Sequence, residues 1–142
     1  MGGAMFKRRS SKQGLLVGTM IPKIEEFKLT KLTASKHYAF IFISLHCMRC
    51  IEFIPFLSDL KVKYDNIEIF LMSTGENKEN EELMKYYSWE FQIFHMNEEN
   101  MLLFFNVDTP PFVIIVNSQG LVMAKGEVFN NKDFENIMNQ AN

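Results

Sequence analysis

The sequence predicts a single α/β domain, with a central mixed β-sheet flanked by helices. Short apolar runs of strand length alternate along the chain with segments in which apolar residues recur at helical spacing. With 142 residues, 47% of them hydrophobic, the chain is long enough for one core and too short for two. No repeat or linker follows residue 14. We therefore expect a flexible basic tail at residues 1–14 and one domain at 15–142.

The first half of the chain predicts one strand-helix-strand step. Residues 38–45 form a continuous apolar, aromatic run, which is typical of a strand buried on both faces. Helical spacing from Met48 to about Tyr64 predicts a helix that begins at two cysteines. A second strand at 67–72 and an amphipathic helix at 79–89 follow.

The second half adds strands to the same sheet. Further strands are predicted at 91–95, 112–116 and 121–126, with a short helix at 98–106. The turn at 117–120 joins the last two strands into a hairpin. In the closing helix, Phe134, Ile137 and Met138 form an apolar stripe. Either Asn130 or Asn131 is available as its N-terminal cap.

Composition excludes several classes of function. Fifteen Lys and Arg against 17 Asp and Glu leave a net charge of −2, so no basic field favours nucleic acid. No apolar run approaches the ~18 residues of a membrane span, and the start lacks a signal peptide, so we expect a cytoplasmic protein. The basic segment Phe6–Arg9 keeps an alternative open, in which a preceding anchor tethers the protein to a membrane or places it outside the cytoplasm.

The two cysteines are placed for thiol-disulfide exchange. Cys47 is expected at a helix N-terminus, where unpaired amides and the helix dipole favour the thiolate that attacks disulfides. Cys50 lies one turn further on, where it can resolve a mixed disulfide formed on Cys47. His46, Met48 and Arg49 frame the pair, and the two cationic side chains add positive charge unless they are simply exposed polar residues.

Two other readings of the cysteines stay open. The pair is half of a zinc site, and the remaining nitrogen donors are His37, His46 and His95, but we expect neither a metal nor a cofactor. A peroxiredoxin fits poorly, because Ser44 stands where Thr is required, three residues before Cys47.

The segment Cys47–Pro55 resembles the active-site helix of the thioredoxin family, in which a proline follows the second cysteine at the same spacing. Pro55 then kinks the helix, unless it ends the helix outright. Residues 107–120 resemble the family's cis-proline loop with the strand and turn that follow it. The resemblance implies a cis bond at Pro111 and a substrate groove shaped by Thr109, Pro110 and Pro111, whereas an ordinary turn proline is the alternative.

Residues 16–22, with a strand expected after Pro22, resemble the N-terminal strand extension of the TlpA, ResA and MauD branch of thioredoxin-like proteins, and residues 91–107 resemble its central insertion. This resemblance implies a thioredoxin fold from about residue 15 to 142. It also implies an accessory role in maturing a particular protein or peptide, such as a cofactor-bearing protein or a bacteriocin.

Four positions depart from the family pattern. Ile41 replaces a buried Asp, Phe53 replaces a Glu of some ResA-type proteins, and His46 replaces a Trp. Pro110 has no backbone N–H to pair with an extended substrate, which favours a dedicated partner.

We expect a thiol-disulfide oxidoreductase acting on a protein or peptide substrate, with a redox protein or small thiol as second partner. A non-catalytic module that binds a metal or a protein is the alternative.

Overall fold

The computed structural model describes residues 13–22 and 37–141, and within them five strands form one mixed sheet. The strand order is β3-β2-β1-β4-β5. Strands β1, β2 and β3 are parallel, whereas β4 is antiparallel to β1 and to β5. The bounds are β1 His37–Ile43, β2 Ile67–Ser73, β3 Gln92–His95, β4 Phe112–Asn117 and β5 Val122–Glu127. The predicted mixed sheet is confirmed.

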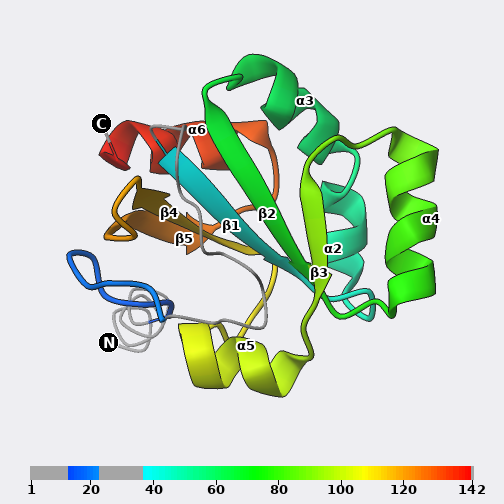
Figure 1. Ribbon diagram of the computed structural model, residues 1–142, viewed down its shortest axis with the longest axis horizontal. Coiled ribbons are helices and arrows are strands. Elements are labelled where there is room, and N and C mark those ends of the chain that lie inside the picture. Colours follow the sequence, from blue (N-terminus) through cyan, green and yellow to red (C-terminus); the bar gives the residue numbers. More distant parts are fainter. Residues whose placement is uncertain (1–12, 23–36, 142) are drawn as a thin grey trace, which may run out of the picture.

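Helices cover both faces of this sheet (Figure 1). Helices α3 and α6 lie above the strands in that view and α5 lies below them, while α2 and α4 stand side by side at the right. Their bounds are α2 Met48–Phe53, α3 Phe56–Lys63, α4 Asn77–Tyr87, α5 Glu98–Phe105 and α6 Asn131–Ala141. No helix in the described part of the chain is long and apolar enough to span a bilayer.

Strand β1 joins two apolar cores. All seven of its residues are buried. Because successive side chains point to opposite faces, Ile41 and Ile43 pack with the helices on the α3 and α6 side, whereas Phe40 and Phe42 pack against α5. The prediction of a strand buried on both faces is confirmed.

The single helix predicted from Met48 to Tyr64 is divided in two. Helix α2 ends at Phe53, and Pro55 is the N-terminal capping residue of α3. Proline has no N–H to continue the helical ladder. Two residues further on, Leu57 N pairs with Ile54 O, only three residues back. The sequence left open a kink or a break at Pro55, and the structure shows a break.

Helix α4 is shifted relative to its predicted range, 79–89. It begins two residues earlier, because Glu76 and Glu79 form a reciprocal capping box. It ends at Tyr87, because Ser88 adopts a left-handed conformation with φ 54°. After this left-handed residue, the Trp89 side chain packs in the core, where its Nε1–H donates to Ser58 Oγ at 3.1 Å.

The predicted hairpin and closing helix are present. Gly120 N donates to Asn117 O across the turn between β4 and β5. Asn130 caps α6 by accepting from Asp133 N at 2.9 Å. The expected central insertion supplies β3 at the sheet edge and α5 on one face. Met20 forms one antiparallel bridge with Leu121, and the expected N-terminal strand after Pro22 lies outside the described residues.

The domain includes the last two residues of the predicted tail. Gly14 N donates to Asn106 O at 2.8 Å, and the Gln13 side chain is buried. The boundary therefore lies at or before Gln13, because these residues hydrogen-bond to a loop more than 90 positions away. Residues 1–12 lie outside the described part of the chain.

Replacing Gly14 by alanine is expected to destabilise the protein. Gly14 has φ +84°, and an added Cβ would lie 2.6 Å from the Phe112 ring. Left-handed strain and overpacking together predict a loss of about 2–4 kcal/mol in the free energy of unfolding, measured by urea titration. Gly18→Ala is the matched control, because Gly18 has φ +92° but nothing within 4 Å. Equal losses in both variants would show that contact with Phe112 contributes nothing.

Candidate active site

Cys47 lies at the junction between β1 and α2. It is the N-terminal capping residue of α2, with extended backbone at φ −110° and ψ 122°, and its amide donates to Ser44 O at 3.1 Å. The side chain is partly exposed, and its Sγ lies 3.6 Å from Pro110 O, to which the thiol donates. Both cysteines are free thiols. The outer sulfur is thus accessible from the surface.

Cys50 lies one turn further along α2 and is 0% exposed. Its Sγ accepts a hydrogen bond from Ser44 N at 3.3 Å, and it packs in the same apolar core as Ile41. Burial raises the pKa of Cys50 to about 12, with further upward contributions from a hydrogen bond with Cys47 and from the charges of Cys47 and Glu98. The hydrogen bond from Ser44 N acts in the opposite direction. The inner thiol therefore stays protonated at neutral pH.

The loop that contains the cysteines is held by its neighbours. Leu45 N donates to Thr74 Oγ1 at 2.8 Å, which joins this loop to the end of β2. His46 N donates to Ser44 Oγ at 3.3 Å. Sequence reasoning did not find the roles of Ser44 and Thr74, because hydroxyl side chains in loops are common and carry no distinctive spacing.

The loop before β4 faces the cysteines. The Pro110–Pro111 peptide bond is cis, at the position that the resemblance implied, and both prolines are buried. Pro111 O accepts from Val128 N at 3.2 Å, which anchors the far side of the loop. Thr109 is exposed beside them.

Gln13 occupies the backbone donors of this loop. Its Oε1 accepts from Asp108 N at 2.8 Å and also from Thr109 N. Pro110 and Pro111 have no N–H. The four residues 108–111 therefore offer no free backbone donor to a substrate. Nothing in the local sequence around Gln13 signals this contact.

The other predicted site residues point outward. His46 and Met48 are exposed next to Cys47. The guanidinium of Arg49 lies over the Phe129 ring, 5.4 Å from its centroid. Arg49, Glu52 and Phe129 line a surface hollow of about 390 Å³. Sequence reasoning did not anticipate the contact with Phe129, which depends on how the loop after β5 packs.

The histidines weighed as zinc ligands are dispersed. His37 begins β1, at the opposite end of that strand from the cysteines, and His95 Nδ1 lies 2.8 Å from Gly75 O. Within residues 13–22 and 37–141, no three side chains of His, Cys, Asp or Glu are grouped so that they could hold a metal ion.

Comparison with known proteins identifies the architecture. No protein-family model and no curated protein matches the sequence. Among solved structures, the thioredoxin domain of a thiol-disulfide oxidoreductase from Bacteroides vulgatus superposes with a TM-score of 0.66 at 16% identity, covering 90% of this chain and 99% of its own. The chain has a thioredoxin fold.

Two further thioredoxin-fold structures match over most of the chain. A thiol:disulfide interchange protein from Bacteroides sp. has a TM-score of 0.62 at 16% identity, over 88% of this chain and 91% of its own. StoA from Bacillus subtilis has a TM-score of 0.56 at 14% identity, over 72% of this chain and 83% of its own. The expected fold is confirmed.

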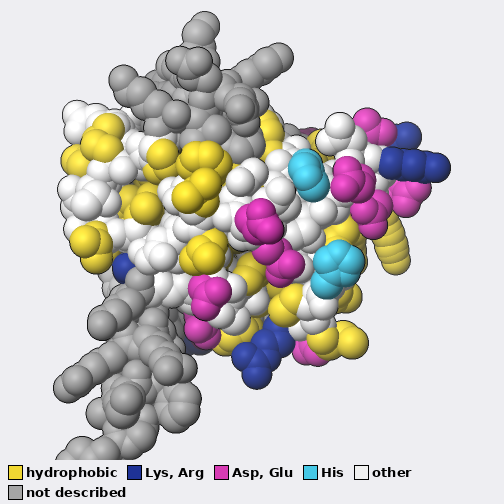
Figure 2. Space-filling model, turned by 90° about the horizontal axis from the view of Figure 1, so that it is seen from below, with side chains coloured by type: hydrophobic (Ala, Val, Ile, Leu, Met, Phe, Trp, Pro, Cys, Tyr) yellow, Lys and Arg dark blue, Asp and Glu magenta, His cyan; other side chains and the backbone are white. Residues whose placement is uncertain are grey.

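Acidic side chains gather on the face of this thioredoxin fold seen from below. Figure 2 shows them across the centre of that face and close to two histidines, whereas lysines and arginines lie toward its margins. A negative surface of this kind favours positively charged partners.

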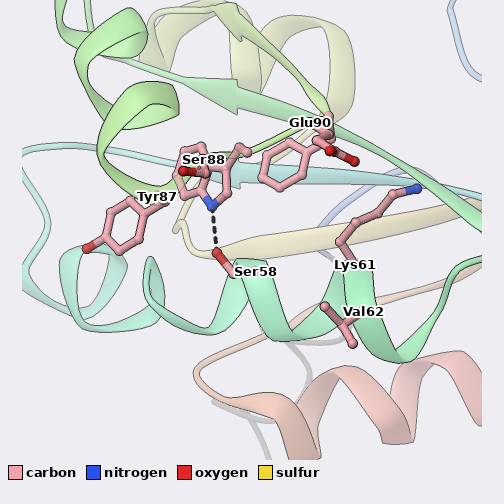
Figure 3. Close-up of a pocket in the computed structure, with 8 residues that line it drawn as sticks. Ser58, Lys61, Val62, Tyr87, Ser88 and Glu90 are labelled. Atoms are coloured by element: carbon pink, nitrogen blue, oxygen red, sulfur yellow. Dashed lines mark hydrogen bonds between the residues drawn. The ribbon is translucent and has the colours of Figure 1, made fainter.

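A hollow of about 200 Å³ lies between α3 and the segment after α4 (Figure 3). Ser58 and Lys61 rise from α3 toward the segment that contains Ser88 and Glu90, and the hydrogen bond from Trp89 to Ser58 crosses the hollow. No cysteine lines this hollow.

The raised pKa of Cys50 predicts a pH-dependent stability. The folded protein holds the Cys50 proton up to about pH 12, whereas the ordinary thiol pKa is 9.0. The contribution of this thiol is therefore complete below pH 9 and is lost as pH rises from 9 toward 12, by about 1.4 kcal/mol per pH unit. The measurement is the difference in unfolding free energy between reduced wild type and Cys50→Ala against pH. A difference that stays constant above pH 9 would contradict the assignment.

Removing the Gln13 acceptor is expected to loosen the cis-proline loop. Gln13→Ala leaves two backbone donors without their partner and should lower the unfolding free energy by about 1–3 kcal/mol. Amide hydrogen exchange at Asp108 and Thr109 should accelerate in the same variant. Gln13→Glu keeps an acceptor and should restore most of the protection; exchange rates unchanged by Gln13→Ala would show that the contact is unimportant.

Proposed function

We propose that this protein is a thiol-disulfide oxidoreductase in which Cys47 is the nucleophile and Cys50 the resolving cysteine. One observation carries the proposal. A partly exposed cysteine begins a helix opposite a cis-proline loop, and a fully buried cysteine lies one turn behind it. The outer sulfur can reach a macromolecular disulfide, while the inner sulfur can reach only the outer one.

The reaction has two exchange steps. The Cys47 thiolate attacks one sulfur of the client disulfide, so that a Cys47–client bond forms, the client bond breaks and the second client sulfur leaves with the electron pair and takes a proton. The Cys50 thiolate then attacks Cys47 Sγ, forming the Cys47–Cys50 disulfide and releasing the first client sulfur as a thiol. The client gains two electrons and the protein loses two. The same steps in reverse oxidise a dithiol client.

The environment of Cys50 determines when the second step can occur. Cys47 contributes to the raised pKa of Cys50 through its hydrogen bond and its charge. Both contributions disappear once Cys47 is bound in a mixed disulfide, so the pKa of Cys50 falls when resolution requires a thiolate. Burial continues to hold the pKa of Cys50 above that of an ordinary thiol. A redox protein or small thiol returns the protein to its starting state.

We propose a dedicated protein or peptide client, such as a maturing bacteriocin. Generic capture of extended chains depends on backbone hydrogen bonds that add the client as a strand. Gln13 already occupies the N–H groups of Asp108 and Thr109, and two prolines follow. Weak main-chain pairing supports recognition through side chains, which selects particular clients.

Cys50→Ser is expected to accumulate a mixed disulfide with a disulfide-bonded peptide, because the first step proceeds and the second cannot. Mass spectrometry under non-reducing conditions detects the adduct. Wild type should show only a transient adduct and a reversible two-electron couple in glutathione redox buffers. Cys47→Ser is the matched control and should form no adduct.

Absence of a reversible couple in wild type, or adducts that form equally well on Cys47→Ser, would refute this mechanism. Biological function retained in full by Cys50→Ser would support a non-catalytic binding module instead.

A further inference from the structure

An apolar groove of about 400 Å³ runs between α2 and α4, directly beside the cysteine loop. Its apolar lining includes Leu45, Ile51, Ile54, Leu83 and Tyr86. Leu45 precedes Cys47 by two residues, and Ile51 follows it by about one helical turn. The groove therefore opens next to the nucleophile, although no residue of the exchange reaction lines it.

Large apolar side chains at this groove remain in water. Tyr86 is 74% exposed and Ile51 is 43% exposed. Single exposed apolar residues are ordinary, but two that line one groove are typical of a binding surface. At the end of α4, Tyr87 lines both this groove and the hollow shown in Figure 3. The hydrogen bond from Trp89 to Ser58 crosses that hollow.

The rim of the groove is acidic. Glu79 and Glu82 line it, and no lysine or arginine does. Neither carboxylate forms an ion pair with any residue of the described segments. An apolar floor with negatively charged carboxylates at its edge complements an apolar side chain flanked by positive charges.

The distance from the nucleophile sets where that side chain lies in a client. Four residues of helix from Cys47 to Ile51 rise about 6 Å. An extended chain advances about 3.3 Å per residue, so about two residues cover the same distance. A side chain two positions from the client cysteine reaches the groove while the sulfur of that cysteine contacts Cys47.

We propose that the groove between α2 and α4 is the docking site for the polypeptide client, binding an aliphatic side chain that is flanked by lysine or arginine and lies two residues from the client cysteine. This inference rests on the proposed function and assigns specificity to a surface outside the cis-proline loop. That loop offers no free N–H in residues 108–111, so affinity for a client must arise elsewhere.

The test compares a docking peptide with a disulfide too small to dock. The peptide contains one intramolecular disulfide, and the leucine of a Lys-Leu-Lys segment lies two residues from each of its cysteines. Hydroxyethyl disulfide is the small, uncharged probe. Reduced protein is mixed with each, and the second-order rate of disulfide reduction is measured. Tyr86→Ser and Glu82→Lys are expected to slow reduction of the peptide about tenfold each, and to leave the small probe unchanged.

Leu103→Ser is the matched control. Leu103 is also 74% exposed, but it lies on α5, on the opposite face of the sheet. This variant should reduce both probes at the wild-type rate. Glu82→Lys should also weaken the preference of the protein for Lys-Leu-Lys over Glu-Leu-Glu, and that preference should diminish with added salt.

Three results would overturn the proposal. Peptide rates that are unchanged in Tyr86→Ser and Glu82→Lys would show that the client docks elsewhere while the oxidoreductase assignment stands. A wild-type dimer that Tyr86→Ser dissociates, detected by analytical ultracentrifugation, would assign the groove to a second copy of the chain. Wild type that reduces neither probe would refute the proposed function itself, and the docking site with it.

Discussion

Strand β1 is paired along both edges and covered on both faces, and the position of the active site follows from that confinement. Its pairing with β4 places Phe42 opposite Phe112, so the loop just before β4 must lie beside the end of β1. Cys47 and Pro110 therefore meet although 63 positions separate them. Shifting either strand would move one complete set of side chains out of its core. The apolar cores thus fix the contact between the nucleophile and the cis-proline loop.

The two cysteines differ in their surroundings because one of them is buried. Both lie on one short helix, but Cys50 enters the core that contains Ile41, while Cys47 remains at the surface. Ile41 cannot accept the proton of Cys50, and the polar contacts of the Cys50 thiol are with the N–H of Ser44 and with Cys47. Burial therefore favours the protonated form of the inner thiol.

The cis-proline loop and the groove between α2 and α4 offer different surfaces. In the cis-proline loop the backbone donors are satisfied internally by Gln13 or removed by proline, which leaves carbonyl groups and side-chain surface. Beside the loop that contains the cysteines, α2 and α4 leave a groove with an apolar floor and acidic edges. Helix α4 ends where Ser88 turns left-handed and Trp89 enters the core, so the packing that ends this helix also bounds the groove.

Local sequence patterns predicted the fold class and the order of the elements, and they singled out Cys47 and Cys50 as the candidate catalytic pair. These features depend on local regularities: a strand buried on both faces is continuously apolar, a packed helix repeats every 3.6 residues, and an exchange site needs two cysteines one turn apart. Only the tertiary structure decided that Pro55 ends a helix rather than bending it, that Gln13 belongs to the domain and satisfies a loop 95 residues away, that Arg49 turns to Phe129, and that a groove lies beside Cys47. Each of these depends on contacts between residues far apart in the chain, whose pairing is fixed by how the helices and loops pack on the sheet and not by any nearby pattern.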